Sequence, residues 1–306
     1  MAAPVPPLVF DTDFPPTSGR PVGIAAGLRR LTAPNAGPYT FRGTNSFLIG
    51  EAELFVVDPG PDDDVHFEAL LAAIGARPVR AILLTHTHRD HSALAPRLKA
   101  ATGAPLWFGG PHRLSRPARP LEINPIATDC DWQIRPDRTL ADGDEIAVDG
   151  LLLRVAATPG HCANHLAFAI DGDDWLLTGD HIMGWNSTLV SVPDGSMADY
   201  LASLERVIAL PCRRYLPAHG GPITDGPVYA RALLAHREQR NAQVAAAVTA
   251  GARSIGDLLR IIYPDLPLPV QPAARMTLAA HVEYLADRGR LAVDWAPLGA
   301  AIRPAG

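Results

Sequence analysis

The sequence of 306 residues predicts an α/β protein that ends in a smaller helical region, and three observations support this expectation. Up to about residue 225, short apolar runs typical of strands alternate with amphipathic runs typical of helices. A strand ending in Asp-Pro-Gly and a strand ending in His are echoed later by one ending in Gly-Asp and another ending in His, which suggests two similar half-sheets facing each other. From about residue 226 the alternation gives way to a helical run.

The composition indicates a globular chain with a substantial core. Hydrophobic residues make up 47% of the sequence and charged residues 19%, which is ordinary for globular proteins. The net charge of −5 provides no basic field that would draw the chain to nucleic acid or to an anionic membrane. The use of 26 Arg against one Lys, with abundant Ala and Pro, is typical of a GC-rich bacterial genome.

The cysteines and the N-terminus predict the compartment. The three cysteines lie far apart without a CxxC pair, which argues against a disulfide framework and for a reducing cytoplasm. The N-terminal residues lack the basic and apolar regions of a signal peptide. No apolar run approaches the roughly 18–20 residues of a membrane-spanning helix, so we expect a cytoplasmic protein with no membrane partner.

The elements of the main part of the chain follow in order. Residues 1–40 are rich in Pro and Gly and are expected to form an extended arm that leads to the first strand. Residues 41–50 and 53–60 predict a hairpin around a Gly-Glu turn. Further strands are expected at residues 80–88, 105–110, 151–161, 165–171, 175–181 and 213–221. Helices are expected at residues 66–75, 92–103 and 197–210.

The C-terminal part is predicted to form a module of its own. Residues 227–251 indicate a long helix, residues 254–263 a short one, and residues 271–295 a helix, a Gly turn and a strand. Three helices and a terminal β-ribbon are typical of a winged-helix-like module. We therefore divide the chain into a main domain, residues 1–225, and a winged-helix-like C-terminal domain, residues 226–306.

The strongest chemical signal is the run His86-Thr87-His88-Arg89-Asp90-His91, at the end of an expected strand. His86 and His88 are two residues apart in extended chain, so both rings can point to the same side. Asp90 and His91 lie where the next helix begins and can turn into the same space. Because imidazole and carboxylate are the usual ligands of catalytic zinc, the run predicts a metal site; the alternative is a cluster of surface or capping histidines.

Three further residues complete this set, and each follows a strand-like run. His161 follows Thr-Pro-Gly, Asp180 follows Thr-Gly, and His219 lies within Pro-Ala-His-Gly-Gly. Taken alone, each would more simply be a turn or capping residue. Together with the first run they provide a ligand set for two metal ions.

The motifs HTHRDH, TPGH, TGD and PAHG, in this order over about residues 42–221, resemble the metallo-β-lactamase superfamily. The resemblance implies an αββα sandwich with its site at one edge of the sheets. It also implies two divalent metal ions, zinc in the first place, with iron and manganese as alternatives. Carried over by position, one ion would be held by His86, His88 and His161 and the other by Asp90, His91 and His219. Asp180 would bridge both ions, and Asp58 would be a supporting structural residue.

A narrower resemblance concerns Asp180-His181, the helix at 197–210 and residues 219–240, which are similar to the lactamase-beta-like-two branch of that superfamily. The branch carries a C-terminal winged-helix-like domain and includes endoribonucleases, thioesterase-like relatives and bacterial hydrolases. His181 and Cys162 depart from the branch pattern, because other small residues are usual there.

Several residues outside the ligand set are weaker candidates. His165 and His181 are candidates for substrate contact, with plain packing as the alternative. The arginines at 113, 116 and 119 alternate with Pro in a loop and could hold an anionic substrate, although simple solvation of the loop is the favoured interpretation. His66, His112, His236 and His281 have no supporting context.

The function predicted from these residues is metal-dependent hydrolysis of a small ester, thioester or lactone, with Asp90 as the catalytic residue that orients the attacking water. The alternatives are an endoribonuclease that cleaves single-stranded RNA and a non-enzymatic binding protein, which the complete ligand set disfavours. Residues 225–306 carry nine Arg against seven acidic residues, a surplus of two, and RNA-tracking proteins normally combine a basic groove with stacking aromatic residues. We expect truncation near Asp225 to leave metal binding intact while changing substrate choice.

Overall fold

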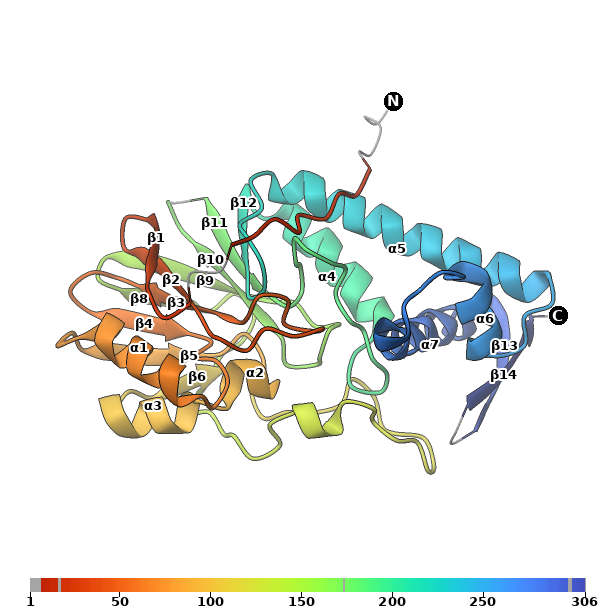
Figure 1. Ribbon diagram of the computed structural model, residues 1–306, viewed down its shortest axis with the longest axis horizontal. Helices are drawn as coiled ribbons and strands as arrows, with labels where there is room; N and C mark the ends of the chain where they lie inside the picture. Colours follow the sequence, from red (N-terminus) through yellow and green to blue (C-terminus); the bar gives the residue numbers. More distant parts are fainter. Residues whose placement is uncertain (1–6, 16–17, 173, 297–298, 306) are drawn as a thin grey trace.

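The computed structural model describes the whole chain except residues 1–6, 16–17, 173, 297–298 and 306. Two β-sheets pack face to face, helices cover their outer faces, and a helical region extends to one side (Figure 1). This arrangement confirms the predicted αββα fold and the helical C-terminal region. Among the described helices, none combines the length and the apolar character needed to cross a membrane.

The first sheet has seven strands that are neighbours in the order of the sequence. They are β1 (Val22–Ala25), β2 (Leu28–Thr32), β3 (Asn45–Ile49), β4 (Leu54–Val57), β5 (Val79–Leu83), β6 (Leu106–Phe108) and β7 (Arg138–Thr139). The pair β3–β4 is antiparallel, as the predicted hairpin requires, whereas β4 to β7 run parallel to one another. The loops that follow β4 and β5 therefore leave the sheet at the same edge.

The second sheet has five strands in the order β12-β11-β10-β9-β8. They are β8 (Glu145–Val148), β9 (Leu151–Ala157), β10 (Leu166–Ile170), β11 (Trp175–Gly179) and β12 (Arg214–Pro217). Only β11 and β12 are parallel in this sheet, so their following loops also share one edge. Asn45 N–H donates to Ala218 O at 2.7 Å, a bond that joins the start of β3 to the loop after β12 and holds the two sheets together near that edge.

The core between the sheets is aliphatic and aromatic. It contains Phe47, Phe55, Val57, Leu83, Leu153, Phe168, Leu177 and Leu216. The outer face of the first sheet is covered by α1 (Asp64–Ile74) and α3 (Ala95–Thr102). The outer face of the second is covered by α4 (Met197–Ala209) and the first turns of α5 (Gly226–Thr249). Strands β3, β4, β10 and β11 are buried along their whole length because both of their faces are covered.

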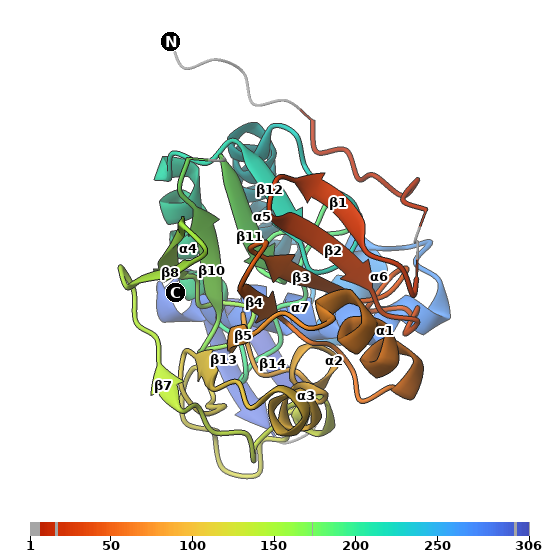
Figure 2. The same cartoon turned by 90° about the vertical axis from the view of Figure 1, so that its left-hand side faces the viewer.

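The expectation of an extended arm over residues 1–40 was wrong for residues 22–32. There, β1 and β2 form an antiparallel hairpin at the edge of the first sheet (Figure 2). Gly27 has φ of 65°, a left-handed conformation that glycine adopts without strain and that lets the chain turn. Leu28 packs between the sheets and Leu31 packs under α1 and α3, so the two leucines fix the strand from opposite faces.

The C-terminal region follows the predicted order of elements. It consists of the remainder of α5, then α6 (Ile255–Ile262), α7 (Gln271–Asp287), β13 (Leu291–Ala296) and β14 (Gly299–Pro304). Val244, Leu258, Leu278 and Val282 form a core of its own. Leu233 of α5 nevertheless packs in the same cluster as residues of α4 and β12, so the core is continuous across residue 226. The division into two domains at that residue stays a prediction.

Replacement of Phe168 by Ala tests the packing between the sheets. The Phe168 ring is fully buried, and we expect Phe168→Ala to lower the free energy of unfolding by about 3–5 kcal/mol, because the removed ring leaves a cavity that the two sheets cannot close. Denaturant titration measures the loss. The control Ile261→Ala changes a side chain that is 56% exposed and should cost under about 0.5 kcal/mol. Equal effects of both changes would contradict this packing.

Candidate metal centre

The seven side chains predicted to hold metal converge at one edge of the sandwich. His86 and His88 follow β5, and Asp90 and His91 lie in the short helix α2 (Arg89–Ser92) directly afterwards. The other three follow strands of the second sheet: His161 follows β9, Asp180 follows β11 and His219 follows β12. Because β4–β5 and β11–β12 are parallel pairs, the loops after them leave their sheets together and meet across the interface.

Three imidazoles form one group, which we call the three-histidine group. His88 Nδ1 lies 3.1 Å from His86 Nε2 and 2.9 Å from His161 Nε2. The three nitrogen atoms therefore point toward a single position. All three residues are buried.

Asp90, His91 and His219 form the second group. Asp90 Oδ2 lies 3.3 Å from His91 Nε2 and 3.2 Å from His219 Nε2. Asp90 is the most open of the seven, with 28% of its side chain exposed. The way into the centre from solvent therefore runs past this carboxylate.

Asp180 lies between the two groups and faces both. Its Oδ1 is 3.5 Å from His91 Nε2 and 3.3 Å from His219 Nε2. Its Oδ2 is 3.7 Å from His161 Nε2, in the three-histidine group. One carboxylate thus presents one oxygen atom to each group.

The electrostatics of the centre favour a cation. Burial opposes the ionisation of Asp180, yet His219 and His91 hold the pKa of its carboxyl well below its usual range. Burial likewise disfavours a charged His219, but Asp180 and Asp90 raise its pKa to about 10. In the three-histidine group, burial and His88 lower the pKa of His161 to about 4, so that its imidazole is neutral and able to act as a ligand.

The donor set fits divalent metal ions. Imidazole nitrogen and carboxylate oxygen are the donors that catalytic metals of this kind take. His91 Nε2 and Asp180 Oδ1 are buried and make no hydrogen bond to any described residue. They lie within ion-pair distance of one another, but a buried polar atom without a hydrogen bond is costly, and a cation between them would satisfy both. The cluster is therefore able to bind metal.

Comparison with known proteins agrees with this geometry. The profile of the metallo-beta-lactamase superfamily matches residues 39–219, which is more than half of the chain and includes all seven side chains. The chain belongs to the metallo-β-lactamase superfamily. Proteins of this superfamily are generally metal-dependent hydrolases, and this chain is an enzyme of that class.

Relatives match well beyond the catalytic core of the superfamily. Lactamase-like protein adaB of Aspergillus niger is 26% identical over 294 residues, covering 90% of this chain and 84% of the relative. The beta-lactamase-like protein 2 homolog of Caenorhabditis elegans is 27% identical over 275 residues, covering 87% of this chain and 86% of the relative. A beta-lactamase domain protein from Burkholderia ambifaria has the same fold, with a TM-score of 0.78, 24% identity and 96% of each chain covered.

Asp58 supports the metallo-β-lactamase centre from the end of β4, as its predicted structural role requires. Its Oδ1 accepts the Thr85 N–H at 2.7 Å, and its Oδ2 accepts the Thr85 hydroxyl at 2.7 Å and lies 3.1 Å from His91 Nδ1. Thr85 Oγ1 lies 3.0 Å from His86 Nδ1. One carboxylate therefore orients one histidine of each group. Asp58 has φ of 49°, a strained conformation that this network of contacts holds in place.

Sequence reasoning missed Asp194 and His112. Asp194 Oδ2 lies 3.1 Å from His88 Nε2, and its Oδ1 lies 2.8 Å from His112 Nε2. His112 Nδ1 contacts Thr87 Oγ1 at 2.9 Å, so both residues brace the HTH run from behind. Asp194 is 106 residues from His88, and His112 is 25 residues from Thr87. Neither belongs to a sequence motif, so their roles can be recognised only in the folded structure.

The two candidates for substrate contact lie behind the ligand set. His165 contacts Thr158 Oγ1 through Nδ1 at 2.8 Å and accepts the Asp180 N–H through Nε2 at 3.1 Å, so that it positions Asp180. His181 packs edge-on against the Tyr200 ring, 5.0 Å between centroids. Both histidines are buried. Their positions support packing and orienting roles, and substrate contact by either ring stays a prediction.

The loop arginines make contacts within the protein: Arg116 and Arg119 are half-buried, whereas Arg113 is exposed. Arg116 and Arg119 form ion pairs with Glu122 and with Glu283 of α7, at distances of 2.6–3.0 Å. Arg113 donates to Gly109 O and Ala163 O. The sequence did not predict that this loop contacts the C-terminal region, because both interpretations of the arginines left out ion pairs with Glu283.

Replacement of Asp58 by Asn tests its supporting role. Asn has one accepting oxygen, so it can keep only one of the two bonds that Asp58 accepts from Thr85, and its NH₂ group cannot accept from His91; His86 and His91 should therefore lose part of their fixed orientation. We expect Asp58→Asn to weaken metal binding by about 10–100-fold in competition with a chelator of known affinity. Glu145→Gln, which removes only an exposed ion pair with Arg154, is the matched control and should leave the affinity unchanged. Wild-type affinity in the Asp58 variant would show that the ligands orient themselves.

Proposed function

We propose that this enzyme hydrolyses a small ester or thioester, lactones included, with two divalent metal ions, zinc in the first place, held by the seven converging side chains. The observation that carries the proposal is the position of Asp180, which presents one oxygen atom to the three-histidine group and the other to Asp90, His91 and His219. Because each oxygen atom of this carboxylate faces a different group of ligands, the position favours two neighbouring cations over a single one.

When bound, the ions would lower the pKa of a water shared between them to about 7, so that hydroxide is present at neutral pH. The chain itself contributes orientation and a place for a proton. The contacts that Asp90 makes with described residues, including the Thr44 hydroxyl at 3.3 Å, all use Oδ2. Its Oδ1 is thereby left to orient the attacking water or to accept its proton at the open side of the centre.

Five of the nine arginines in residues 225–306 contact aromatic or acidic side chains, which supports an ester or thioester over RNA. Arg237, Arg240 and Arg288 stack on the rings of Tyr200, Tyr263 and Tyr284. Arg260 and Arg303 pair with Asp257 and Asp294. A groove that binds single-stranded RNA needs cations free to contact phosphate and exposed aromatic rings on which bases can stack. Here these arginines contact tyrosine rings and carboxylates of the protein instead.

A substrate screen on the zinc-loaded enzyme tests the choice. We expect hydrolysis of acyl thioesters or activated esters, and no cleavage of single-stranded RNA at physiological salt. His88→Ala should abolish the activity, whereas His236→Gln, a histidine of α5 outside the centre, should leave it intact. RNA cleavage that His88→Ala abolishes, without ester or thioester hydrolysis, would replace this proposal with the endoribonuclease alternative. Absence of activity on all substrates would favour a binding protein.

Asp90→Asn tests the role of this residue in the reaction. The amide keeps the shape of the side chain but cannot accept a proton. We expect kcat to fall by about 10²–10⁴-fold while KM changes by less than about threefold, at zinc concentrations that keep both sites filled. Metal content is measured on the same sample, because Asp90 is also a proposed ligand. An unchanged kcat with two ions bound would exclude the catalytic role.

A further inference from the structure

We infer that the C-terminal region completes the three-histidine group: Arg237 of α5 and Glu283 of α7 hold the two loops whose atoms orient His161 and His88. The inference rests on the proposed metal site and adds two positioning residues that lie outside the superfamily match at residues 39–219.

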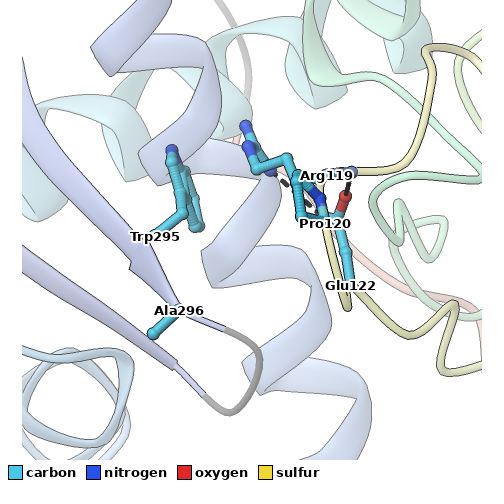
Figure 3. A pocket seen from close by; sticks show the side chains of 5 residues that line it. All are labelled: Arg119, Pro120, Glu122, Trp295 and Ala296. Atoms are coloured by element: carbon cyan, nitrogen blue, oxygen red, sulfur yellow. Dashed lines mark hydrogen bonds and ion pairs between the residues drawn. The ribbon is translucent and has the colours of Figure 1, made fainter.

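Glu283 holds the loop that precedes the η1 turn (Ala127–Asp129). Its two carboxylate oxygen atoms accept Arg116 Nε at 2.9 Å and Arg116 Nη2 at 2.6 Å. Oε2 also accepts Arg119 Nη2 at 2.6 Å. The guanidinium of Arg119 lies 4.1 Å from the centroid of the Trp295 ring in β13, at the pocket seen in Figure 3. Glu283 is buried, and a two-pronged arginine pair in that setting fixes position as well as charge.

The same loop reaches the three-histidine group through Ser115, the residue before Arg116. The Ser115 hydroxyl donates to Asp194 O at 2.7 Å, and its N–H donates to Pro193 O at 3.0 Å. Asp194 in turn contacts His88 Nε2, and the other ring nitrogen of His88 faces the metal position. Glu283 is thus linked to His88 by polar contacts that are joined through the Ser115–Arg116 backbone and through Asp194.

Arg237 holds the second loop, at residues 186–192, from α5. Its side chain is buried, lies over the Tyr200 ring and donates through Nη2 to Thr188 O. The Thr188 hydroxyl donates to Asp180 O at 2.7 Å. The next residue, Leu189, accepts the His161 Nδ1–H at 2.7 Å. Arg237 therefore anchors Thr188, the residue directly before the Leu189 carbonyl group that sets the orientation of His161.

Both anchors act on histidine side chains of the same half of the centre, because the contact of Thr188 with Asp180 is to the main-chain oxygen and not to the carboxylate that faces both groups. The described contacts that orient His91, His219 and Asp90 come instead from Asp58, Gly43 O and Thr44, all on the first sheet side of the fold. Loss of either anchor should therefore weaken one metal position more than the other. This selectivity separates a positioning role from a general contribution to stability.

Stepwise binding of Co²⁺, followed by its absorption spectrum, tests the inference on the full-length chain. His88→Ala and His219→Ala identify the spectrum of each position. We expect Glu283→Gln and Arg237→Met each to weaken the three-histidine position about 10–100-fold, and the other position less than about threefold. Asp294→Asn is the matched control, because it removes an exposed ion pair within the β13–β14 ribbon and should change neither position.

Arg116→Lys provides a second variant in case the buried changes impair folding. It keeps the charge but cannot form the two-pronged contact, so it should weaken the same position in the same direction. Equal weakening of both positions, or a lowered Tm with both affinities unchanged, would show a merely structural role and overturn the inference. Failure of the wild-type chain to bind two ions would instead overturn the proposed function.

The contacts of Arg237 and Glu283 also change the expected effect of a truncation near Asp225. Such a truncation removes Arg237 and Glu283 together, so we no longer expect it to leave metal binding intact.

Discussion

A carboxylate buried between two clusters of histidine is the constraint on which the rest of this structure depends. Asp180 is 7% exposed, and an isolated charge at that depth would be strongly unfavourable. His91 and His219 lie within ion-pair distance of this carboxylate, and the acidic groups around them raise the pKa of both rings, which favours their charged form; metal ions would compensate the charge more fully. The histidines must in turn be held in place, which explains the shell of polar contacts from Asp58, Thr85, Asp194 and the Leu189 carbonyl group.

Topology brings these groups together. Parallel pairing of β4 with β5 and of β11 with β12 sends the loops after them out of their sheets at the same edge, and the bond between Asn45 and Ala218 joins the two sheets there. The apolar core between the sheets fixes their spacing, so a loop on one sheet meets the loops of the other in a defined register. The strand pairs that build the fold are in this way also what positions the centre.

The sequence was sufficient for the parts of the structure that local patterns encode. The candidate ligands follow strands within short motifs, and the spacing of apolar residues predicts the helices α4, α5 and α7. Asp194 was not predictable, because its partner His88 is 106 residues away and no spacing rule connects them. Arg116 and Arg119 were misread for the same reason: an arginine in a Pro-rich loop looks solvated until the fold brings Glu283 beside it. The hairpin of β1 and β2 was missed because Gly and Pro were given more weight than the buried leucines Leu28 and Leu31.

On this view of the centre, the seven side chains hold two ions with Asp180 between them. Crystals of the zinc-loaded protein, with anomalous differences recorded on either side of the zinc absorption edge, test this most directly. We expect two peaks, one among His86, His88 and His161 and one among Asp90, His91 and His219, with an oxygen atom of Asp180 next to each. A single peak at full zinc loading, or two peaks with Asp180 turned away from one of them, would contradict it.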